Sequence, residues 1–124
     1  DIETFVYARR KPFDLEKFTD FVEQDWPDEV IRAKGPLWQN ANPDMCYIFE
    51  QAGHQMRLME NGLFVDSAPE DEKQQIIADN PELRDYWDDE VGDRETRLCI
   101  IGRHMDKDAV IAGLDACLTD WHRA

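Results

Sequence analysis

The feature that most constrains the fold is an apolar strand followed by a capped amphipathic helix near the end of the chain. Thr96 to Gly102 (TRLCIIG) is apolar on both faces, which is typical of a strand buried within a sheet. Asp106 then predicts the N-cap of a helix over 106–121. This helix has one apolar stripe, which consists of Val110, Ile111, Leu114, Cys117, Leu118 and Trp121. The stripe has to be buried, so we expect the helix to pack on the sheet and to share a core with Leu98 and Ile100.

The first third of the chain predicts a strand, a helix and a second strand. Residues 2–8 are rich in β-branched and aromatic side chains, and we expect a strand that is buried on both faces or nearly so. Residues 14–24 place apolar side chains at helical spacing after an N-capping Asp, which predicts a helix. Residues 29–34 predict a strand that ends at Gly35 and Pro36.

The middle of the chain predicts a hairpin. Residues 40–44 (NANPD) are turn formers and predict a loop. Residues 45–50 and 55–60 predict two antiparallel strands joined by a four-residue connection. Asn61 and Gly62 predict a further tight turn after the hairpin.

Two short helical segments complete the pattern, over 69–79 and 81–87. The order of elements therefore predicts one α+β domain over 1–124. We expect a mainly antiparallel sheet of four to five strands with helices packed on a face.

The acidic composition excludes two classes of partner. The chain has 28 acidic against 14 basic side chains, so its surface repels nucleic-acid phosphates and anionic lipids. No apolar run approaches the ~20 residues of a membrane-spanning helix. The three cysteines, Cys46, Cys99 and Cys117, are widely spaced on apolar segments. They predict reduced thiols in the core of a cytoplasmic protein.

The sequence contains none of the common catalytic motifs. It lacks a GxxxxGK[ST] phosphate loop, a GxSxG turn, an HExxH pair and a CxxC pair. His54, His104 and His122 are far apart, which favours structural or exposed histidines over a metal site. The acidic runs at 70–72 and 88–90 are interpreted as solvated surface. We therefore predict no catalytic, cofactor-binding or metal-binding residue in this chain.

Basic side chains are scarce, and several lie close together in the sequence. Arg9, Arg10 and Lys11 end the first strand, and Arg32 and Lys34 lie in the second. Together they would form a positive patch that meets carboxylates or a phosphate on another domain. Internal ion pairs with the surplus acids are the alternative, and the sequence leaves both open.

Three ordered segments resemble the C-terminal domain of the CobW family of metallochaperone GTPases. They are ARRKPFD, IRAKGPLW and GDRETRLCIIGRHMDKDAVIAGLDACL, and together they span nearly the whole chain. The acidic WDDE before GDR is similar to the bacterial zinc-responsive branch of the family. The matching positions are Arg10, Pro12, Phe13, Arg32, Lys34, Gly35, Trp38, Gly92, Asp93, Arg94, Leu98, Ile101 and Gly102.

The resemblance implies a non-catalytic regulatory or interaction domain of a GTP-dependent metal chaperone. It implies a larger parent protein whose N-terminal GTPase domain, absent from this sequence, uses GTP, Mg²⁺ and zinc or cobalt. The expected partners are that GTPase domain and a client metalloprotein. We expect a contact patch for them at Arg9, Arg10, Arg32, Lys34 and Trp38. The alternative is a stand-alone module that binds a small molecule or a metal in an aromatic pocket.

Overall fold

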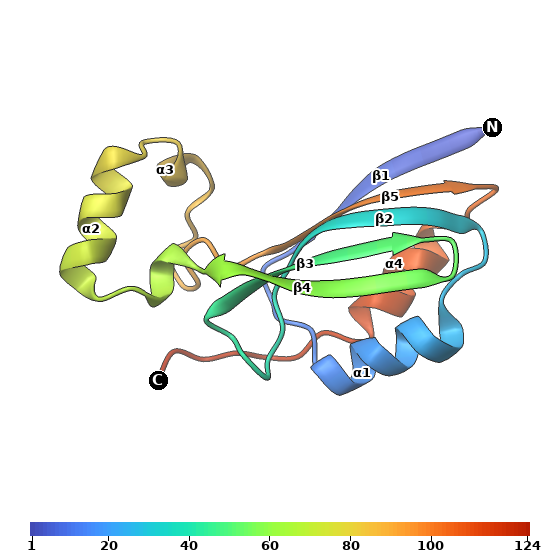
Figure 1. Ribbon diagram of the computed structural model, residues 1–124, viewed down its shortest axis with the longest axis horizontal. Helices are drawn as coiled ribbons and strands as arrows, with labels where there is room; N and C mark the ends of the chain where they lie inside the picture. The colour runs from blue at the N-terminus through green and yellow to red at the C-terminus, as the bar shows by residue number, and fades with distance from the viewer.

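One antiparallel sheet of five strands, in the order β1-β5-β2-β3-β4, organises the computed structural model, which describes residues 1–124 (Figure 1). Every pair of neighbouring strands is antiparallel. The strands are β1 (Ile2–Arg9), β2 (Val30–Leu37), β3 (Met45–Ala52), β4 (Gln55–Leu63) and β5 (Thr96–Arg103). The predicted α+β class and the antiparallel sheet are confirmed.

Two helices cover one face of this sheet, as Figure 1 shows. They are α1 (Leu15–Asp20), which continues as the π-helical turn η1 (Phe21–Asp25), and α4 (Lys107–Asp115). The remaining helical pieces lie beyond one end of the sheet (Figure 1). These are the 3₁₀ turn η2 (Val65–Ser67), α2 (Glu70–Asp79) and α3 (Leu83–Tyr86). Asp14 caps α1, because its side chain accepts a hydrogen bond from the Lys17 amide, as predicted.

The main core lies between the sheet and the α1/α4 layer. Ile111 and Leu118 pack against it, so the predicted link between the late strand and the closing helix is confirmed. A smaller cluster of Trp38, Phe64 and Val91 forms a second core. The main core consists of Tyr7, Phe13, Phe18, Val30, Ala33, Leu37, Phe49, Leu98, Ile100, Val110, Leu114 and Cys117.

The prediction that strands 2–8 and 96–102 are buried on both faces was wrong. In β5, Leu98 and Ile100 are fully buried, whereas the intervening Cys99 is exposed. β1 is an edge strand, and Val6 is 55% exposed. Helices cover only one face of the sheet, so alternate residues of both strands face solvent.

β2 was predicted to end at Gly35 and Pro36, but it continues through them to Leu37. Gly35 has a φ of 154°, and a Cβ at this position would lie 1.9 Å from the Arg97 carbonyl oxygen. The glycine therefore permits a close approach of β2 to β5. The β2/β5 pairing ends at Lys34, so the missing amide hydrogen of Pro36 removes no hydrogen bond from that ladder.

The hairpin connection is shorter than predicted. Ala52 pairs with Gln55, so only Gly53 and His54 form the turn, with Gly53 at a φ of 60°. Asn61 and Gly62 form no separate turn but lie inside β4. The β3/β4 register shifts here, because a bulge absorbs the extra residue.

The closing helix was predicted to end at Trp121, but it ends at Asp115. Backbone hydrogen bonds hold the chain that follows. The Asp14 amide donates to the Cys117 carbonyl at 2.8 Å, and the Thr119 amide donates to the Pro12 carbonyl at 2.9 Å. These tertiary bonds replace the helical ones, and they direct Trp121 into the second core.

Candidate functional site

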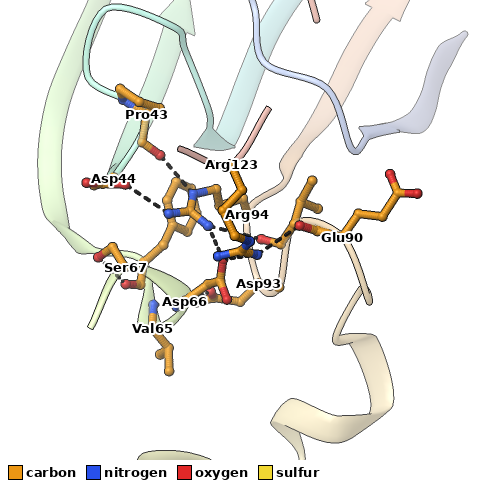
Figure 2. Close-up of polar contacts among 12 residues, drawn as sticks. Pro43, Asp44, Val65, Asp66, Ser67, Glu90, Asp93, Arg94 and Arg123 are labelled. Carbon is orange, nitrogen blue, oxygen red and sulfur yellow. Dashed lines mark hydrogen bonds and ion pairs between the residues drawn. The ribbon is translucent and has the colours of Figure 1, made fainter. Parts of the chain in front are cut away.

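A buried ionic cluster lies at η2, where Asp66, Arg94 and Arg123 come together (Figure 2). At its centre is Asp66, whose side chain is 3% exposed. The carboxylate forms ion pairs with Arg94, with Arg123 at 2.8 Å and with Lys73 at 3.3 Å. Burial by itself raises the pKa of this carboxyl group, but the three cations outweigh it and hold the pKa of Asp66 below its ordinary value. We call these four residues the Asp66 cluster.

Arg94 connects the cluster to the loop that precedes β3 (Figure 2). Its guanidinium also pairs with Asp44 at 2.8 Å and donates to the Pro43 carbonyl at 3.1 Å. The Arg94 side chain is only 3% exposed, so almost none of it is available to a partner. Arg94 therefore joins three segments of this chain to one another.

The two residues before Arg94 serve the same framework. The Asp93 carboxylate accepts hydrogen bonds from the Val65 and Asp66 amides at 2.8 and 2.9 Å, and so holds the start of η2. Gly92 has a φ of 69°, and a Cβ there would lie 2.4 Å from that of Asp66. The Gly-Asp-Arg segment therefore has a structural role.

The C-terminal tail is fastened to this cluster. The Trp121 ring lies edge-on to Trp38, with 5.4 Å between ring centroids, and the Arg94 guanidinium lies 4.5 Å from the Trp121 centroid. Arg123 donates to the Glu90 carbonyl at 2.8 Å and pairs with Asp66. The C-terminal tail thus closes the second core against residues from the interior of the chain.

Arg10, predicted as a patch residue, is held by the loop before β5. Its guanidinium forms an ion pair with Glu95 at 2.8 Å. It donates to the Gly92 carbonyl at 2.9 Å and to the carbonyl of Tyr86. The neighbouring Lys11 pairs with Asp120 at 2.9 Å. These contacts are internal.

Arg9 also points into the molecule's own helix layer. It pairs with Asp115 of α4 at 2.9 Å, and the Tyr7 hydroxyl donates to the same carboxylate at 2.7 Å. The hydrogen bond with Asp115 raises the pKa of Arg9. Burial opposes ionisation of Asp115, but Arg9 and Tyr7 lower the pKa of its carboxyl group overall.

Trp38 is fully buried and has no surface to offer a partner. Its backbone amide donates to the Thr96 hydroxyl, and its indole N–H donates to the Pro43 carbonyl at 3.0 Å. Trp38 is therefore a core residue, and its predicted place in a contact patch was wrong.

Arg32 and Lys34 lie on the sheet face that no helix covers, which we call the open face. Strand pairing places Val6, Cys99, Lys34, Glu50 and Arg57 in one row across all five strands. Because paired residues lie on the same face, this row defines the open face. Glu50 pairs with Lys34 at 3.4 Å and with Arg57 at 3.2 Å.

The five predicted patch residues therefore do not converge. β5 lies between β1 and β2, so the two strands that carry these residues are not neighbours. Arg9 faces the helices, whereas Arg32 and Lys34 face the opposite side. The internal-pair alternative holds for Arg9 and Arg10. An external role remains a prediction for Arg32 and Lys34.

Three further basic residues of the open face were not predicted from the sequence, namely Arg57, Arg97 and Arg103. Arg97 and Arg103 alternate with the buried side chains of β5, so the period-two pattern of TRLCIIGR contained the signal. Arg32 makes no ion pair and is exposed. The strands of this face thus carry five basic side chains, against the carboxylates of Glu50 and Glu95. On a chain of net charge -14 this face is distinctly basic.

The candidate metal ligands are not grouped. His54, His104 and His122 are exposed and far apart in the chain. No set of three or more His, Cys, Asp or Glu side chains is placed to hold a metal ion. The residues present therefore do not fit a metal centre within this domain.

The three cysteines are free thiols in different environments. Cys117 is buried, as predicted, and Cys46 is half-buried, whereas Cys99 is exposed on the open face. Burial raises the pKa of the Cys46 and Cys117 thiols, which favours their protonated form. None of the helices has the length and apolar character required to cross a bilayer.

Fold and site together define a small α+β domain whose signature residues hold its own framework and which leaves one basic sheet face open. The model of the cobalamin synthesis protein cobW C-terminal domain matches residues 2–118, and the chain belongs to this family. The predicted resemblance is thereby confirmed.

Known proteins similar to this chain are much longer. The zinc-regulated GTPase metalloprotein activator 1 of Dictyostelium discoideum is 27% identical over 120 residues, which is 94% of this chain and 25% of that protein. The zinc-bound YjiA GTPase from E. coli has the same fold, with a TM-score of 0.64 at 15% identity. A zinc-bound triple mutant of YjiA gives a TM-score of 0.63 at 16% identity. Both comparisons cover 96% of this chain and 30% of the YjiA chain.

Proposed function

We propose that this chain is a non-catalytic interaction domain of a CobW-type, GTP-dependent zinc chaperone. In this proposal the open face packs against the parent's GTPase domain and couples it to a client metalloprotein. The parent's nucleotide, Mg²⁺ and zinc belong to the GTPase domain, because this chain has neither a phosphate loop nor grouped metal ligands. The Dictyostelium relative is named as a zinc-regulated GTPase, which supports zinc over cobalt.

The observation that carries the proposal is the composition of the open face. It combines five basic side chains with exposed apolar ones, among which Ile2 and Val6 are each 55% exposed. A sheet face that has only to meet water needs no such apolar side chains. Basic groups beside exposed apolar side chains are suited to an acidic protein surface, and they guide the association electrostatically.

Charge reversal on the open face tests this function. The Arg32→Glu variant of this chain and the separately expressed GTPase domain of its parent are mixed at low and at high salt. We expect the variant to bind about tenfold more weakly at low salt, because a like charge now opposes the acidic partner. We also expect high salt to weaken the wild-type complex and to reduce the difference.

Arg84→Glu is the matched control, because Arg84 is exposed on α3, away from the sheet, and makes no ion pair. It introduces the same charge change and should leave the affinity unchanged. Circular dichroism of both variants verifies that they are folded. Equal affinities for Arg32→Glu and wild type would contradict the proposal, as would equal losses in the two variants.

A further inference from the structure

A groove of about 690 Å³ lies on the helix side of the sheet, between α1/η1 and the β3/β4 hairpin. Val22 and Trp26 of the helical segment form one wall. Phe49 of β3 and Met56 and Leu58 of β4 line the other side. The volume lies in the range of sites that take a small ligand or a few side chains.

The groove exists because the helix layer is narrower than the sheet. α1 packs Phe18 against Phe49 of β3, with 5.2 Å between ring centroids, and β4 lies beyond it as the edge strand. Leu58 consequently remains 38% exposed. An apolar strip on an edge strand beside a helix is a surface that another chain can cover.

The helical wall contains two irregular features. η1 is π-helical over Phe21–Asp25, and π-helical turns are frequent at functional sites. Trp26 packs against Phe21 and Phe49, and its indole nitrogen is buried without a hydrogen-bond partner. Buried polar groups are nearly always hydrogen-bonded in native proteins, so this unmet indole N–H is an unusual feature of the groove wall.

The helical wall of the groove is acidic. Glu23 and Asp28 line it, and neither carboxylate has an ion-pair partner. On the strand side Arg57 also lines the groove, but its guanidinium is paired with Glu50 at 3.2 Å. The only basic residue of the helical segment is Lys17. Further exposed carboxylates of the same segment are Glu16, Asp20, Asp25 and Glu29. A cationic partner would neutralise this local excess of negative charge.

We propose that this groove binds a segment of a partner protein in which a large apolar side chain is flanked by Lys or Arg. The apolar side chain enters between Trp26 and Leu58, and the basic side chains meet Glu23 and Asp28. The proposal rests on the proposed function, because it assigns this segment to the client protein. Apart from Arg57, which borders both, the groove and the open face lie on opposite sides of the sheet, so the GTPase domain and the client can be bound together.

Selection from a random peptide library displayed on phage, with the wild-type chain as bait, tests the preference. We expect enrichment of peptides with Leu, Phe or Met next to Lys or Arg. A fluorescein-labelled copy of the most enriched peptide is then titrated against variants by fluorescence polarisation. Leu58→Glu should weaken binding at least about tenfold, because it places a charge in the apolar strip. Leu58 is already partly exposed on an edge strand, so this variant is expected to fold.

Reversing the charge of the two carboxylates of the helical wall tests whether they select the basic side chains of the peptide. Glu23→Lys combined with Asp28→Lys should abolish the preference and favour a peptide in which Glu replaces Lys and Arg. The matched control is Asp71→Lys combined with Glu72→Lys on α2, which changes the net charge equally at a distance from the groove. An equal loss in this control would mean that binding reflects only the overall negative charge, and the proposal would fail.

The test also separates this proposal from the proposed function. Leu58→Glu should leave the affinity for the GTPase domain unchanged, and Arg32→Glu should leave peptide binding unchanged. A library without enriched apolar-basic peptides, or enriched peptides that bind Leu58→Glu as well as wild type, would overturn the groove proposal alone. If the groove takes only small molecules, the library will contain no enriched apolar-basic peptides.

Discussion

At the scale of single residues, Asp66 is the centre of an ionic cluster that no sequence motif predicted. Three cations from three segments converge on its carboxylate, and a buried carboxylate is tolerated only when it is paired in this way. The same holds for Arg94, which would be a buried unpaired cation without Asp66 and Asp44. Residues of the family signature are therefore needed for folding before they can contribute to function.

Asp66→Asn should destabilise the domain by about 3–5 kcal/mol at neutral pH, because it leaves Arg94 and its neighbours partly uncompensated in a buried site. The exposed Asp71→Asn, on α2, is the control and should change the stability little. Urea denaturation monitored by circular dichroism measures both. A loss no larger than that of the control would show that the Asp66 cluster is solvated in solution.

The difference in stability between wild type and Asp66→Asn should depend on pH in one direction. Because the pKa of Asp66 is lowered in the folded state, its contribution is fully present above its ordinary pKa of about 3.9. The contribution is lost as the pH falls through the folded value. The difference in stability between wild type and Asp66→Asn should therefore narrow below about pH 4.

At the scale of elements, the sheet depends on the close approach of β2 and β5. Gly35→Ala should cost about 3 kcal/mol of stability, because the added methyl group would overlap the Arg97 carbonyl and the backbone has little room to move. Gly53→Ala is the matched control. It also has a positive φ, of 60°, but nothing lies within 4 Å of its added Cβ.

The Gly53→Ala control separates the cost of steric overlap from the cost of a positive φ. Gly53→Ala should lose only the ~1–2 kcal/mol that a left-handed backbone costs an L-residue. Chemical denaturation compares the two variants directly. If both lose the same amount, then the strands separate slightly at Gly35 and the close approach is not required.

At the scale of the whole molecule, we propose that the chain contributes surfaces for partner proteins and no nucleotide site. We expect calorimetric titration with magnesium-GTP to give no saturable heat, because no glycine-rich loop with a following Lys and hydroxyl is present to hold phosphates and Mg²⁺. The GTPase domain of the proposed parent, titrated under the same conditions, is the positive control. Saturable binding in the micromolar range by this chain would refute the prediction and reopen an independent nucleotide site.

The two proposed surfaces also belong to this scale. The open face is basic, the helical wall of the groove is acidic, and the sheet lies between them, with Arg57 bordering both. An arrangement of this kind allows one domain to hold two different partners without competition between them.

The order and type of the elements could be predicted from the sequence alone, because they depend on local patterns. Helical and alternating spacings, the Asp14 cap and the stripe of α4 are properties of neighbouring residues, and they identified the α+β fold and its core. The open face and the placement of the basic residues depend on strand order instead. β5 inserts between β1 and β2, so Arg9 and Arg32 are separated and face opposite sides, although both lie in signature segments.

The boundaries and the buried charges were likewise decided only by tertiary contacts. Gly35 and Pro36 look like a strand end until β5 lies against them. The closing helix stops at Asp115 because residues 12–14 bind the backbone that follows. Asp66 becomes the centre of an ionic cluster through cations that lie 7, 28 and 57 positions further along the chain, at Lys73, Arg94 and Arg123. A sequence pattern records periodicity within a segment, whereas these features arise from pairing between distant segments.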